Sequence, residues 1–114
     1  MAMTSPPVFI QQIDFDHQRA MFRVLISSAA PSSYELIAFY RPTRQDPFRQ
    51  LGTPKPHLTA TGAFDTAVKW MIAAPGYMAD PLHAVTTYGE PFLKAAELDA
   101  VMRRHNISHG ITHA

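Results

Sequence analysis

Residues 20–27 read AMFRVLIS and residues 34–41 read YELIAFYR, two runs rich in β-branched and aromatic residues. Such residues suit the pleated, half-buried surface of a β-strand. The intervening residues 28–33, SAAPSS, have turn chemistry, and Pro31 cannot donate a hydrogen bond to a strand ladder. The stretch from Ala20 to Arg41 therefore predicts a β-hairpin, around which the rest of the chain is organised.

Neither arm of this hairpin has a fully polar side. Side chains alternate between the two faces of a strand, so each arm places apolar residues on both faces. In the first arm, one face has Phe22, Val24 and Ile26, and the other has Met21, Arg23 and Leu25. In the second arm, one face has Leu36, Ala38 and Tyr40, and the other has Ile37 and Phe39. Either both faces are covered within the chain, or one presents an apolar surface to a partner.

The segments on either side of the hairpin complete an α+β pattern. A strand at residues 8–15 precedes it through a short polar connection, which predicts an antiparallel meander of three strands. A helix follows, with its apolar stripe at i, i+3, i+4, i+7 and i+8, an N-cap at Thr61 and an end at Pro75-Gly76. The residues of the stripe are Phe64, Ala67, Val68, Met71 and Ile72.

Residues 82–88 predict a short fourth strand, and residues 95–104 a second helix. Lys94 is the N-cap position of this helix, and Asn106 suits the left-handed position after its end, with Ile107 folding back on Met102. The order of elements is then β-β-β-α-β-α. We expect an antiparallel sheet of three to four strands with two helices packed on one face.

The domain boundaries follow from where this periodicity fails. Residues 1–7 are expected to be disordered, and residues 8–107 to form a single domain. Residues 41–57 have no periodicity and carry four basic residues against one acid, which predicts a long basic loop. Residues 108–114 are expected to form a flexible, histidine-containing tail.

The composition excludes several classes of protein. The chain has 114 residues, enough for one domain, and with 46% hydrophobic and 17% charged residues it can form a core. It has no cysteine, which excludes disulfides and thiolate sites. Its net charge of +1 argues against binding nucleic acid through bulk charge. A signal peptide and a membrane-spanning run are not predicted, so a cytoplasmic protein is expected.

No motif of high specificity for catalysis, cofactor binding or phosphate binding is present in the sequence. Three weaker patterns involve histidine and carboxylate residues, and in each the structural interpretation is favoured over the functional one. They are the repeat of His105, His109 and His113 as metal ligands, the pair Asp14 and Asp16 beside His17, and His83 with Glu90 as a base and its orienting group. No metal and no cofactor are predicted.

The basic loop is the best functional candidate. Arginine side chains suit carboxylate or phosphate recognition, and aromatic and arginine residues are enriched at binding hot spots. The predicted partner-binding residues are Arg41, Arg44, Phe48, Arg49, Lys55 and Trp70. These features favour a small non-catalytic binding or regulatory protein that acts on another protein and forms a homodimer. A nucleic-acid-binding protein using the same loop and the sheet aromatics is the alternative, and a small enzyme with histidine and carboxylate groups is the second alternative.

Overall fold

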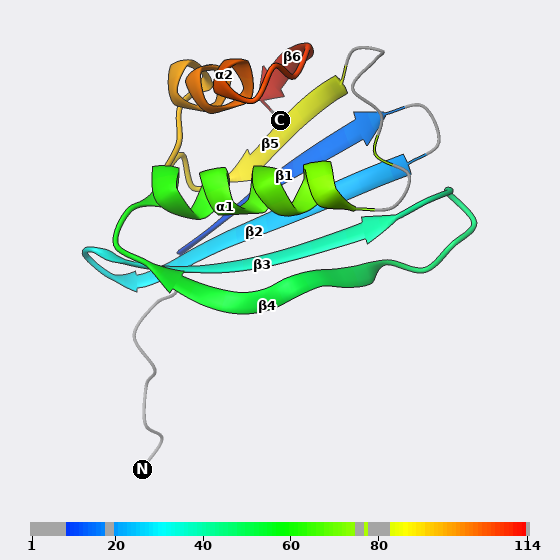
Figure 1. Ribbon diagram of the computed structural model, residues 1–114. Coiled ribbons are helices and arrows are strands. Elements are labelled where there is room, and N and C mark those ends of the chain that lie inside the picture. The colour runs from blue at the N-terminus through cyan, green and yellow to red at the C-terminus, as the bar shows by residue number, and fades with distance from the viewer. Residues whose placement is uncertain (1–8, 18–19, 75–76, 78–82, 114) are drawn as a thin grey trace.

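The computed structural model describes residues 9–17, 20–74, 77 and 83–113, apart from the side chains of His17 and His113. The described elements, in chain order, are β1 (Phe9–His17), β2 (Ala20–Ala30), β3 (Ser33–Arg41), β4 (Arg49–His57), α1 (Ala60–Ala73), β5 (His83–Gly89), α2 (Ala95–Arg104) and β6 (His109–His113). The strands form one sheet in the order β4-β3-β2-β1-β5-β6. Both helices lie on the same face of this sheet (Figure 1), so the α+β class is confirmed.

The hairpin is formed as the sequence predicts. Strands β2 and β3 pair antiparallel, with Met21 opposite Arg41 and Ile26 opposite Leu36. The turn between them places Ser32 at φ 57°. Strand β1 pairs antiparallel with the other side of β2, which completes the predicted meander.

The helix ends follow local capping chemistry. At α1, the Thr59 hydroxyl accepts a hydrogen bond from the Gly62 N–H at 3.0 Å, so this helix begins before the predicted cap at Thr61. At the end of α2, Asn106 is at φ 59°, and the Ile107 N–H donates to the Met102 carbonyl at 2.9 Å. These two observations confirm the predicted left-handed stop and the fold-back of Ile107.

Two segments predicted as irregular are strands. The second half of the expected loop 41–57 is β4, which pairs antiparallel with β3 at the edge of the sheet. Its prolines, Pro54 and Pro56, obscured the strand signal, but an edge strand tolerates proline because one side of its backbone needs no partner. The expected tail 108–114 contains β6, which pairs parallel with β5.

The sheet is therefore mixed and six-stranded, where an antiparallel sheet of three to four strands was predicted. The connection through α2 makes the parallel β5–β6 pair possible, since parallel neighbours need a crossover and cannot be joined by a tight turn. The disorder predicted for residues 1–7 falls outside the described residues. Within the described part of the chain, neither helix combines the length and apolarity that crossing a membrane requires.

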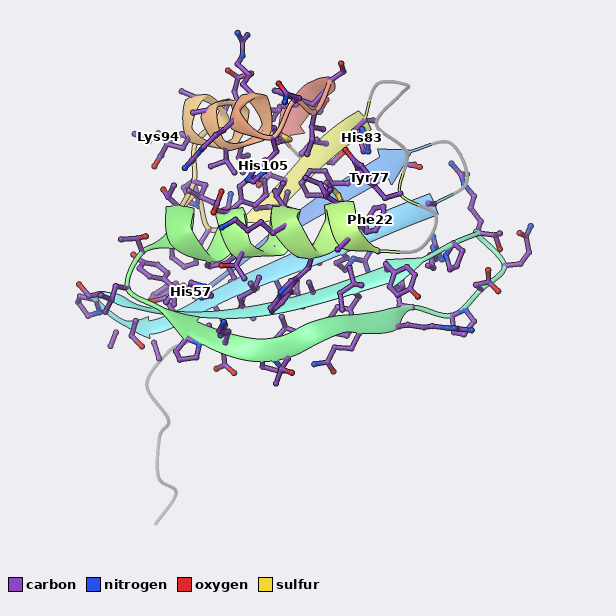
Figure 2. All side chains as sticks on the ribbon, in the orientation of Figure 1. Phe22, His57, Tyr77, His83, Lys94 and His105 are labelled. Carbon is purple, nitrogen blue, oxygen red and sulfur yellow. The ribbon has the colours of Figure 1, made fainter. Side chains whose placement is uncertain are left out.

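The core lies between the sheet and the two helices. Side chains from one face of the sheet are buried against the stripes of α1 and α2, and the Phe15 and Phe64 rings stack with their centroids 5.9 Å apart. Figure 2 shows the side chains filling this layer, with His105 between the two helices. The opposite face of the sheet carries no described helix (Figure 1), and it holds the candidate site.

Candidate functional site

The face of the sheet turned away from the helices is called the open face. It is defined by the strand residues that alternate with the core residues. They are Ile10, Gln12, Asp14 and Asp16 of β1, Met21, Arg23, Leu25 and Ser27 of β2, Glu35, Ile37, Phe39 and Arg41 of β3, and Ala84, Thr86 and Tyr88 of β5. Phe48, just before β4, packs on the same face through its contacts with Arg23 and Arg41.

Apolar side chains occupy the middle of the open face. Leu25, Ile37 and Phe39 are half-buried by their strand neighbours, with no described helix over them. Ile10 and Tyr88 lie toward one end of the face and are 47% and 41% exposed. The solvated face of an antiparallel sheet is normally polar, so this apolar content points to a surface that contacts something.

An ion pair joins β1 and β2 on the open face, beside the apolar side chains. The Arg23 Nε lies 2.9 Å from Asp14 Oδ1, and its Nη2 lies 3.2 Å from Oδ2, which makes a two-pronged contact. The Asp14 side chain is only 6% exposed, and it also accepts a hydrogen bond from Gln12 at 3.1 Å. The hydrogen bond to Asp14 raises the pKa of Arg23 against the opposing effect of burial. The charges of this pair are thus compensated within the chain.

Arg23 of this ion pair and a second arginine, Arg41, both lie against the ring of Phe48. The guanidinium carbons of Arg23 and Arg41 are 4.7 and 4.6 Å from the centroid of the Phe48 ring. The Arg41 Nη2 lies 3.4 Å from the Met21 sulfur, a weak acceptor, and its buried Nε has no hydrogen-bond partner among the described residues. Arg41 therefore holds a fixed position without a carboxylate from the described part of the chain.

The sheet separates the six predicted partner-binding residues. Arg41 and Phe48 meet on the open face, and Arg44 reaches the same side through a 3.4 Å contact with Asp16, where the Arg44 side chain is exposed and the Asp16 side chain is half-buried. Arg49 lies opposite Tyr40 and Lys55 opposite Leu36, which are residues of the helix side. Arg49, Lys55 and Trp70 therefore do not form one surface with the other three.

Trp70 packs on strand β4 at a position that only glycine fits. Gly52 has φ +63°, and a Cβ on it would lie 2.7 Å from the Trp70 indole. A hollow of about 490 Å³ opens beside this contact and is lined by Gly52, Thr53, Pro54, Lys55 and Trp70. None of the charged residues that line the open face contributes to it.

Two histidines lie within hydrogen-bond distance of aspartates. The Nε2 of His105, just after α2, lies 2.8 Å from Asp65 of α1, and the Nε2 of His109 in β6 lies 2.7 Å from Asp99 of α2. The other ring nitrogen of His109 contacts the Ile107 carbonyl at 2.7 Å. Among the described residues, no cluster of three or more potential ligands could hold a metal ion.

His83 does not lie near Glu90, the carboxylate with which it could pair as a base and its orienting group. His83 is fully buried on the helix side, where its ring stacks on Tyr77 with the centroids 5.7 Å apart (Figure 2). Glu90 follows the other end of β5, roughly 20 Å away along the strand. Asp14 lies on the opposite face of the sheet. The side chain of His17 is outside the described residues, so its pairing with an aspartate stays a prediction.

Sequence reasoning did not single out Glu35, a charged residue of the open face. Its signal was the alternation within YELIAFYR, which puts Glu35 on the same face as Ile37, Phe39 and Arg41.

No family model matches this sequence, and comparisons with curated proteins and with solved structures found no significant similarity. The function is therefore argued from the open face itself.

Proposed function

We propose that the protein is a non-catalytic binding domain that acts by contacting another protein through the open face of its sheet. The observation that carries the proposal is the row of Leu25, Ile37 and Phe39, three large apolar side chains on a side that no described helix covers. Apolar side chains gathered on one surface and bordered by charged groups are typical of protein-binding sites.

The charges of the open face favour a protein over a nucleic acid. A phosphate-binding surface needs cations that are free to replace counterions. Here Arg23 is held by Asp14 and Arg44 contacts Asp16, while Glu35 adds a further negative charge. A mixed set of charges around an apolar centre matches the rim and core of a protein interface better than a basic groove.

The face is also a better candidate than the β4 edge of the sheet. An exposed edge binds another strand through its free N–H and C=O groups. Pro54 and Pro56 of β4 have no N–H, so this edge is poorly suited to add a strand. The side chains of the open face, and not the backbone of β4, are therefore the proposed contact surface.

The test is photo-crosslinking from two single positions in the native host. A photo-reactive amino acid replaces Phe39 on the open face in one variant and Leu58, which is 78% exposed outside it, in the other. We expect a covalent adduct with protein from position 39 and a much weaker one from position 58. A second substitution, Ile37→Lys, should reduce the adduct because it places a charge in the apolar centre.

Adducts with DNA or RNA at position 39 would support the alternative function and contradict this proposal. Equal protein adducts from both positions would also contradict it, because the crosslinks would then reflect random encounters. Urea unfolding of each variant checks that the fold is retained.

A further inference from the structure

We propose that the occupant of the open face is a second copy of this chain, with the two β3 strands antiparallel so that Glu35 of each copy meets Arg41 of the other. This inference rests on the proposed function, namely that the open face binds protein, and it names the partner. It is carried by two charges of opposite sign that the described structure leaves unpaired at opposite ends of one strand.

The first unpaired charge is that of Glu35. Its neighbours across the sheet are Ser27 on β2 and Pro56 on β4, and neither is charged. Glu35 is exposed and makes no ion pair with another described residue. A cation from outside the described chain can therefore approach it.

The second unpaired charge is that of Arg41. Its described contacts are the Phe48 ring and the Met21 sulfur, and its buried Nε has no hydrogen-bond partner among the described residues. Stacking on Phe48 fixes the guanidinium, so it loses little freedom when it binds a carboxylate. The other arginines described on this face, Arg23 and Arg44, already contact aspartates.

The positions of these charges along β3 are self-complementary. The open-face residues of β3 are, in order, Glu35, Ile37, Phe39 and Arg41, and the two charges are six positions apart along the strand, a distance of roughly 20 Å. Two copies can place their open faces together by a two-fold axis that lies in the plane between the two sheets. If this axis is perpendicular to β3 and passes at the level of Ala38, it lays one β3 antiparallel over the other and exchanges the two ends of the strand. Each Glu35 then meets an Arg41, and each Ile37 packs near a Phe39.

The parallel arrangement is disfavoured by the same charges. It would place Glu35 against Glu35 and Arg41 against Arg41, and like charges brought together at an interface oppose association. The Asp14–Arg23 pair is internally neutral, so it opposes neither arrangement. The charge pattern therefore selects the antiparallel two-fold dimer, the isologous form in which the same patch serves both copies.

The area of the face is sufficient for a dimer. Five of the six strands, β4, β3, β2, β1 and β5, are adjacent, and seven residues of each would give a flat area of roughly 570 Å² at about 4.8 Å per strand and about 3.4 Å per residue. Protruding side chains make the accessible area larger than this projection. It is thus of the order of the ~800 Å² per partner of a standard interface.

The test is a charge exchange between copies, followed by sedimentation velocity and native mass spectrometry. The wild-type protein is expected to be a dimer. Glu35→Arg puts two arginines at each end of the interface, and Arg41→Glu puts two acids there. Each variant alone should therefore dimerise with an affinity about tenfold or more below that of the wild type. Arg104→Glu, on the exposed side of α2, is the matched control and should remain a dimer.

Mixing the two variants is the decisive step. In a heterodimer, the arginine introduced by Glu35→Arg faces the glutamate introduced by Arg41→Glu, and the other end keeps a native Glu35–Arg41 pair. We therefore expect the mixture to form heterodimers, which also proves that both variants are folded. A mixture that stays monomeric overturns the inference, as does a wild-type dimer that neither variant weakens.

A wild-type protein that is monomeric at high micromolar concentration also overturns the inference. The crosslinking experiment then tests the proposed function without the dimer. A covalent adduct between position 39 and a different protein would support the proposed function, and the lack of any such adduct would contradict it. The two failures are therefore distinguishable.

Discussion

Gly89 lies directly against the backbone carbonyl of Ile10, at the end of the β1–β5 pair. Gly89 has φ +83°, and the N–H of the next residue, Glu90, donates to the same Ile10 carbonyl at 2.9 Å. A Cβ at position 89 would collide with this oxygen. The close approach therefore requires glycine for two reasons, its left-handed backbone and its lack of a side chain.

Gly89→Ala should lower the free energy of unfolding by at least about 2 kcal/mol, because the strained backbone and the clash with Ile10 add together. Urea unfolding measures it. The matched control is Gly110→Ala in β6, where a Cβ would have no heavy atom within 4 Å. A change of less than about 0.5 kcal/mol is expected there, and equal losses at the two glycines would contradict the packing of β5 on β1.

Asp65 makes the stability of the helix layer depend on pH. Burial alone would raise the pKa of Asp65, but hydrogen bonds from His105 and Lys69 outweigh it and hold that pKa below its ordinary value of 3.8. A carboxyl with a lowered folded-state pKa contributes stability above the unfolded pKa, and this is lost as the pH falls through the folded pKa. Acidification from about pH 5 should therefore weaken the α1–α2 contact.

Asp65→Asn should reduce this acid dependence and lower the free energy of unfolding at pH 7 by about 1–2 kcal/mol, since the contact of Asp65 with His105 is partly buried. Thermal unfolding between pH 3 and pH 7 measures both effects. Glu90→Gln removes a charge from an exposed position after β5 and serves as the control. If both variants have the same pH profile, Asp65 does not couple the helices.

Regular elements with strong local signals were predictable from the sequence. The hairpin arms have strand composition over eight residues each, and α2 has both a helical pattern and the Asn106 stop. The signals for β4 were obscured, since Gly52, Pro54 and Pro56 disfavour a strand locally. Pairing with β3 on one side overrides that preference, and no local pattern reports such tertiary pairing.

The candidate site was predictable in part. Two apolar sides on the hairpin indicated a surface that needs a cover, and the helices of the described part of the chain cover only one of them (Figure 1). The sequence did not show that Arg41 lies on one side of the sheet and Lys55 and Trp70 on the other, because proximity in sequence does not specify the side on which a residue lies. That assignment depends on the register of β4 and its irregularity opposite Leu36 and Ala38.

Gly52→Ala should move the Trp70 ring. The added Cβ has no room beside the indole, and a φ of +63° is unfavourable for alanine. Trp70 is the one tryptophan of the chain, so intrinsic fluorescence reports on it alone. We expect a red-shifted emission as the ring moves toward solvent. Thr53→Ala at the exposed neighbouring position should leave the spectrum unchanged, and an unshifted spectrum for Gly52→Ala would contradict the packing of α1 on β4.

Arg23→Met should destabilise the protein by roughly 2–4 kcal/mol, because it leaves the buried Asp14 carboxylate without its cation. Replacing both residues, as Asp14→Leu with Arg23→Met, should cost less than the single change, since no charge is then left unpaired. Arg44→Met is the matched control, because its contact with Asp16 joins side chains that are 69% and 43% exposed. Such surface pairs contribute less than about 1 kcal/mol. Urea unfolding of the four proteins, including the wild type, gives the comparison. If Arg23→Met cost no more than Arg44→Met, Asp14 would be hydrated and the β1–β2 part of the open face would be accessible to water.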